Sequence, residues 1–66
     1  MNNEGEKLTI NFEVTAAEAI ALAQFFKRTA YSDCKEKAVS SAEAHEMMDG
    51  INAAYKGLRE AGFNPR

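Results

Sequence analysis

The sequence of 66 residues has few of the residues that stabilise very small proteins or equip them for catalysis. It contains one cysteine, Cys34, one histidine, His45, one proline and no tryptophan. One cysteine excludes a disulfide within the chain and is typical of a reducing compartment. One cysteine and one histidine are also too few for a structural zinc site, which uses four such ligands. We therefore expect no metal and no cofactor, and a chain this short to need association with another chain.

Long apolar runs and an excess of basic residues are absent as well. No run of about 18 apolar residues occurs, and the polar stretch 1–7 lacks the apolar core of a signal peptide, so we expect a cytoplasmic protein without a membrane span. The net charge of −2 disfavours a partner that is held mainly through its phosphate groups, although a local basic patch stays compatible with it. No phosphate loop, nucleophile elbow or metal-ligand spacing is present, which predicts that the chain is not an enzyme.

The segment 7–14 alternates strictly between polar and apolar residues. A period of two residues is typical of a half-buried β-strand, because successive side chains of a strand point to opposite faces. The sequence therefore predicts a strand over 7–14, preceded by a flexible stretch over 1–6. The apolar face of this strand consists of Leu8, Ile10, Phe12 and Val14.

Two amphipathic helices are predicted after the strand. Thr15-Ala16-Ala17-Glu18 has the spacing of a capping box, and apolar residues at helical spacing follow it, so we expect a helix over 15–29. Ser40-Ser41-Ala42-Glu43 repeats the pattern and predicts a second helix over 40–61.

The remaining segments are predicted to connect and end these helices. Residues 30–39 lack periodicity and form the connection, with room for a short turn of helix. Gly62 is a natural stop for the second helix and Pro65 prevents its continuation, which leaves 62–66 as a tail.

The order strand, helix, helix predicts a single small α+β domain, mostly α, over 1–66. A lone strand has unpaired edges, so we expect a homodimer in which the two strands pair antiparallel. An extended N-terminal arm, or a strand that pairs only with the sheet edge of a target protein, is the alternative. The expected core comprises Leu8, Ile10, Phe12, Leu22, Phe26, Met47, Ile51, Tyr55 and Leu58.

Two charged clusters are candidate contacts with a partner. Lys27 and Arg28, with Tyr31 nearby, belong to the only local basic cluster, which reads either as a solvated helix end or as an anion contact. The acidic patch consists of Glu43, Glu46 and Asp49. It could dock on a basic surface, but acidic residues at a helix start also have a purely structural explanation.

Gly50 and Gly57 form a third candidate contact. Each glycine lowers helix stability by about 1 kcal/mol relative to alanine, so its place inside a helix calls for an explanation. Seven residues apart, the two glycines share one face and would let another helix approach closely. Such a face serves either as packing within the protein or as a groove for a partner.

Several short stretches together resemble a known kind of protein. They are Phe26-Lys27-Arg28, Tyr31-Ser32-Asp33, Ala38-Val39 followed by Glu43-Ala44, and the ending Leu58-Arg59-Glu60-Ala61-Gly62-Phe63-Asn64-Pro65-Arg66. Through them the chain resembles a family of very short, uncharacterised proteins encoded by bacterial phages, prophages and conjugative plasmids. The resemblance implies a non-enzymatic protein-interaction module in a bacterial host cell that binds a host protein. An inhibitor of a defence complex, of the anti-CRISPR or anti-defence type, is one such module.

A weaker resemblance, to ribbon-helix-helix repressors, rests on the order strand, helix, helix. It implies an alternative function as a DNA-binding transcriptional regulator whose paired strands read bases in the major groove. The residues at the reading positions would be Lys7, Thr9 and Asn11. Glu13 would repel phosphate, and the connection 30–39 is longer than that fold normally has.

Overall fold

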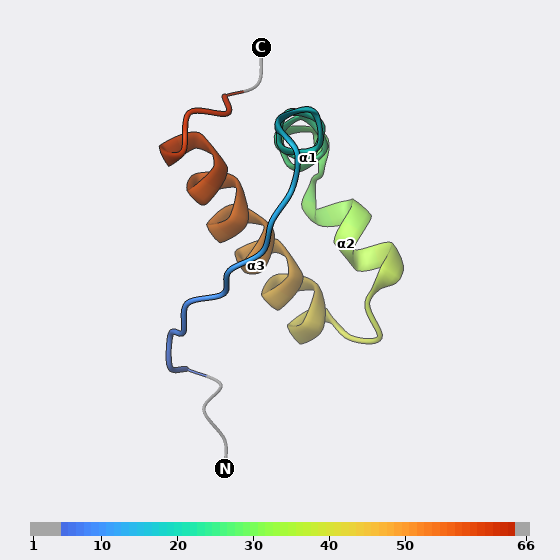
Figure 1. Cartoon of the computed structure of the whole chain (residues 1–66). Helices are drawn as coiled ribbons and strands as arrows, with labels where there is room; N and C mark the ends of the chain where they lie inside the picture. The colour runs from blue at the N-terminus through green and yellow to red at the C-terminus, as the bar shows by residue number, and fades with distance from the viewer. Residues whose placement is uncertain (1–4, 65–66) are drawn as a thin grey trace.

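Three α-helices make up the regular structure of residues 5–64, the part of the chain that the computed structural model describes (Figure 1). They are α1 (Ala16–Arg28), α2 (Tyr31–Lys37) and α3 (Ser41–Glu60). The long helix α3 packs against both α1 and α2 and is the element that joins the fold. The fold is therefore helical within residues 5–64.

The predicted strand and the predicted α+β class are wrong. Residues 7–14 are extended, but they pair with no other segment among residues 5–64 (Figure 1). The exposed fraction is 73% for both Leu8 and Ile10 and 63% for Phe12, so these three side chains do not belong to the core, contrary to the expectation. The alternation of residues 7–14 indicates an extended segment with one apolar face. A β-strand also needs a segment to which its backbone can hydrogen-bond, and residues 5–64 provide none.

The start of α1 follows from the predicted capping box. The Thr15 hydroxyl accepts a hydrogen bond from the Glu18 amide at 3.1 Å, and a Glu18 carboxylate oxygen accepts one from the Thr15 amide at 2.9 Å. At the other end, the Thr29 hydroxyl donates to the Phe25 carbonyl at 2.6 Å. These local bonds place α1 almost where the sequence predicts a helix.

Helix α2 occupies most of the predicted connection 30–39. An Asp33 carboxylate oxygen accepts a hydrogen bond from the Ala30 amide at 2.8 Å and caps the helix start. Only Cys34 of its seven residues is buried, so α2 has no apolar periodicity that would reveal it. The sequence therefore allows a helical turn here but does not define one.

The ends of α3 are defined by two caps. The Ser40 hydroxyl accepts from the Glu43 amide at 3.1 Å, but the Glu43 carboxylate accepts from Val39 at 2.7 Å instead of from Ser40, so the predicted second capping box is only half formed. At the C-terminal end Gly62 has a φ of 101°. The Phe63 amide donates to the Leu58 carbonyl at 2.9 Å, which completes a Schellman motif.

Small side chains form the core where the helices meet. The fully buried residues among 5–64 are Ala19, Ala23, Cys34 and Ala44. The larger residues expected in the core from the helices are only half-buried: Leu22, Phe26, Met47, Ile51, Tyr55 and Leu58. Alanine lets helices approach closely but removes little apolar area from water, so this core contributes little stability.

The chain is more open than a compact protein of its size. Its radius of gyration is 13.0 Å, whereas about 11 Å is typical of this length. Its accessible surface is 5368 Å², whereas a compact monomer of this mass exposes roughly 4200 Å². The excess is about 1200 Å² per chain.

Two expectations concern the ends of the chain and the membrane. Residues 1–4, in the stretch predicted to be flexible, and Pro65 lie outside the described residues. None of the helices found in residues 5–64 has the length and apolar character to cross a bilayer.

Two glycine substitutions should change stability in opposite directions. A Cβ at Gly57 meets nothing within 4 Å, so Gly57→Ala should stabilise α3 by about 0.5–1 kcal/mol. Gly62→Ala should destabilise the protein by about 1 kcal/mol, because its positive φ disfavours any side chain. Urea unfolding followed by circular dichroism measures both changes. Equal effects of the two substitutions would contradict this account of the end of α3.

Candidate functional site

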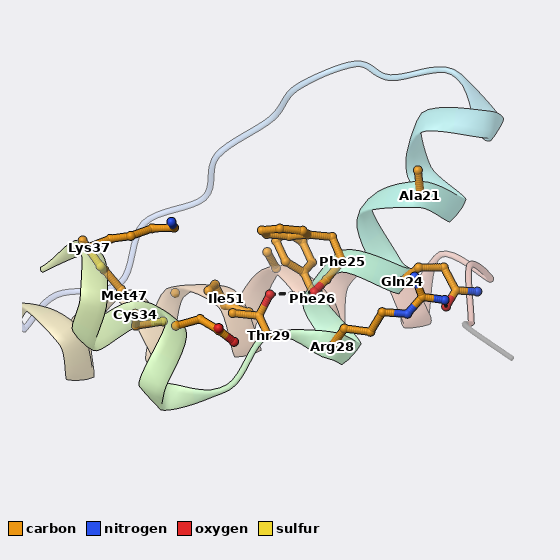
Figure 2. Close-up of a pocket in the computed structure, with 13 residues that line it drawn as sticks. Ala21, Gln24, Phe25, Phe26, Arg28, Thr29, Cys34, Lys37, Met47 and Ile51 are labelled. Atoms are coloured by element: carbon orange, nitrogen blue, oxygen red, sulfur yellow. Dashed lines mark hydrogen bonds between the residues drawn. The ribbon is translucent and has the colours of Figure 1, made fainter.

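An open apolar groove lies between the C-terminal half of α1, the helix α2 and the middle of α3 (Figure 2). Its volume of about 1020 Å³ is at the upper limit for pockets that bind small molecules. Phe25 at its edge is 58% exposed, so a small ligand would stay largely in contact with water. The groove is therefore better suited to a segment of a protein than to a small molecule.

Two adjacent aromatic residues of α1 form one wall of the groove. The Phe25 and Phe26 ring centroids are 5.9 Å apart, and the rings meet edge to face at 62°. Phe26 is only half-buried, although a core position was expected for it, and Phe25 is exposed. Consecutive helical residues point about 100° apart, so the small core covers only one of the two rings.

Side chains of α2 and α3 form the rest of the apolar lining. Met47, Ile51 and Ala54 contribute from α3, and Cys34 contributes from α2 (Figure 2). Gly50 lies beside them, and a Cβ added there would meet nothing within 4 Å. The predicted Gly50 and Gly57 strip therefore faces open space and does not serve as packing within the monomer.

A second, smaller hollow extends the apolar surface toward the N-terminal segment. It is lined by Val14 and Leu22 and shares Ala21 and Phe25 with the groove. Phe25 thus stands between the two hollows. The apolar surface is continuous from the end of the N-terminal segment to the middle of α3.

The predicted basic cluster is divided in the structure. Arg28 and Lys37 line the groove together with Asp33, and Arg28 donates a hydrogen bond to Gln24 at 3.4 Å. Tyr31 lies elsewhere, with its ring centroid 4.8 Å from that of His45. Lys27 is exposed on α1 and does not line the groove. The groove therefore has two basic side chains and one acidic side chain at its edge.

The acidic patch has a structural role at one of its three positions. The Glu43 carboxylate accepts the hydrogen bond from the Val39 amide and so helps to cap α3. Glu46 and Asp49 are exposed on α3, outside the lining of the groove.

The residues that the DNA-binding alternative assigns to base reading lie on the extended segment. Lys7, Thr9 and Asn11 are exposed there. The two paired strands that would present them in a major groove do not occur among residues 5–64.

The comparison with known families covers the entire chain. The model of a family of unknown function, DUF7706, matches residues 1–66. The chain belongs to this family. The expectation of a small uncharacterised family is therefore confirmed. The family match does not bear on an origin in phages or plasmids. No curated protein and no solved structure matches the chain.

Cys34 of this DUF7706 chain is buried, although the sequence places it in a connection. Its Sγ lies 3.9 Å from the Met48 Sδ, at the contact of α2 with α3. A free cysteine behaves as a small apolar residue and is among the most often buried residue types. The burial of Cys34 could therefore have been predicted from its residue type alone.

The burial of Cys34 should limit its reaction with thiol reagents. We expect labelling by a disulfide reagent to be much slower in the native protein than in urea, because the thiol becomes accessible only when α2 separates from α3. The labelling rate across a urea series measures that separation. Immediate, complete labelling without denaturant would contradict the packing of α2 on α3.

Proposed function

We propose that the chain is a non-enzymatic protein-interaction module whose groove binds an apolar segment of a partner protein. The observation that carries the proposal is the exposed Phe25 at the edge of an unfilled apolar groove, in a chain with so few buried side chains. Exposed apolar surface of this kind is typical of protein interfaces, and aromatic residues in hollows commonly dominate their binding energy.

The chemistry of the groove indicates what the partner segment should contain. Apolar side chains would enter between Phe25, Met47 and Ile51. Acidic residues beside them would meet Arg28 and Lys37, which outnumber Asp33 at the groove. We therefore expect an apolar segment with acidic flanks.

We further propose that the partner is a protein of a bacterial host cell and that the chain acts there as an inhibitor of a defence complex, carried by a mobile genetic element. The sequence resemblance to phage and plasmid proteins supports this, and the absence of recognisable catalytic motifs agrees with an inhibitor that works by occupying a surface. The DNA-binding alternative has less support, because its paired strands do not occur among residues 5–64 and the net charge is −2.

Two substitutions on the same helix test the role of the groove. Phe25→Ser should abolish specific capture of a bacterial protein by the immobilised chain, because it removes the exposed ring of the aromatic wall. Ile20→Ser is the matched control: Ile20 is also on α1 and 51% exposed, but it does not line the groove. Both variants should keep the helical circular dichroism spectrum. Equal capture by the wild-type chain and Phe25→Ser, measured by quantitative mass spectrometry, would refute the groove as the binding site.

The inhibitor role and the DNA-binding alternative have separate readouts. In bacteria with an active defence system, the wild-type chain and Ile20→Ser should raise the plating of a targeted phage, whereas Phe25→Ser should not. Salt-dependent DNA binding that is lost in Asn11→Ala would instead favour the DNA-binding alternative.

A further inference from the structure

We propose that two copies of this chain exchange their N-terminal segments, so that residues 6–14 of one copy lie in the groove of the other. Residues 6–14 are called the arm below. The inference rests on the proposed function because it uses the same groove, and it names the occupant of that groove in the free protein. The contact is between an extended segment and helices, and it needs no β-pairing between the two arms.

The arm carries apolar side chains that its own chain leaves uncovered. Leu8, Ile10 and Phe12 are all more than three-fifths exposed. In an extended segment such alternate side chains lie roughly 6.6 Å apart on one face, and the stretch from Leu8 to Val14 spans about 20 Å. An unfilled apolar groove and an unpacked apolar segment therefore occur in the same molecule.

The charges of the arm and the groove are complementary. The arm contains Glu6, Lys7 and Glu13, with a net charge of −1. The groove is lined by Arg28, Lys37 and Asp33, with a net charge of +1. The arm thus has an apolar face and a net negative charge, and opposite charges at the edge help to orient such a contact.

The exposed area of the chain is large enough for a stable dimer. The accessible surface of 5368 Å² exceeds that of a compact monomer of this mass by about 1200 Å². A standard interface buries roughly 800 Å² per partner. An exchange of arms, in which each copy both gives and receives one, would therefore bury an ordinary interface area and bring each chain near the surface of a compact protein.

The base of the arm lies beside Phe25, but the rest of the arm is exposed and does not fill the groove of its own chain. The capping hydrogen bonds of Thr15 fix the point where the arm joins α1. Residues 12–15 contain no glycine, proline, asparagine or aspartate, and Val14 and Thr15 are β-branched, so this stretch favours an extended course over a tight turn. Figure 1 shows the arm running away from the start of α1 as an extended segment. In a dimer with a two-fold axis, each arm lies in the groove of the other copy, so both arms are covered and both grooves are occupied.

Solution mass is the first test, measured by light scattering and sedimentation on the full chain. We expect a mass of twice 7.3 kDa for the wild-type chain. The arm variant Ile10→Ser/Phe12→Ser and the groove variant Phe25→Ser should each raise the dimer dissociation constant by about a hundredfold or more, because each change acts twice in the dimer. Ile20→Ser and Val39→Ser, which change exposed residues outside the groove and the arm, should leave it unaltered.

Mixing the two damaged variants distinguishes an exchange from other dimers. The groove variant has an intact arm, and the arm variant has an intact groove, so a mixed pair keeps one native contact. We expect the mixture to form heterodimers at concentrations where each variant is monomeric. A tag on one variant identifies the mixed species.

Three results would overturn the exchange. The first is a monomeric wild-type chain, which would be expected if the arm closed on its own groove. The second is a dimer that Phe25→Ser dissociates and the arm variant does not, which would be expected if two grooves met face to face. The third is a mixture that gains nothing over its components.

The proposed function fails by a different measurement. It fails if Phe25→Ser still captures the bacterial protein, whatever the solution mass. If the arm variant is monomeric but captures that protein at least as well as the wild-type chain, both the exchange and the function of the groove are supported. A monomeric wild-type chain that loses capture with Phe25→Ser overturns the exchange alone.

Discussion

The shortage of large buried side chains is the constraint on which the rest of this structure depends. Ala19, Ala23 and Ala44 let α1 and α2 approach α3 closely, but each methyl group removes little area from water. The aromatic and long aliphatic side chains that could contribute more lie at the edges of the contact or on the arm. The helices are thus positioned mainly by close contact of small residues and by their caps, and the larger apolar groups stay on the surface.

Hydrogen bonds at the helix ends compensate in part for this small core. Thr15 with Glu18, Asp33 with Ala30, and Ser40 with Glu43 satisfy donors at the three helix starts. Such caps contribute about 1 kcal/mol each and define where a helix begins, but they do not hold helices together. The structure therefore has well-defined elements and a weak contact between them, and covering the groove would strengthen the whole.

The parts of the fold that follow from the sequence are those with a local cause. The Thr15 and Glu18 box and the Gly62 stop depend on residues within one turn of each other, and both take the expected form. Helix α2 was not definitely predicted because its N-cap residue, Ala30, has no side chain that accepts a hydrogen bond, and because its sequence shows no apolar face. The groove was not predicted from the sequence, because it forms where three helices meet and its lining residues are far apart in the chain. The sequence placed Arg28 in a basic cluster with Lys27 and Tyr31, but only Arg28 of these three lines the groove.

The failed strand shows which part of an alternating pattern carries information about a single chain. Alternation at Leu8, Ile10 and Phe12 states that one face of an extended segment is apolar. It does not indicate whether that face is covered by a sheet, by helices or by another molecule, because each of these can pack against alternate side chains of an extended segment. Hydrogen-bonding partners decide between a strand and an arm, and within residues 5–64 there is no segment to supply them. Because no sheet forms, the apolar face of residues 7–14 stays exposed in the single chain. It can therefore be covered only through contact with another molecule.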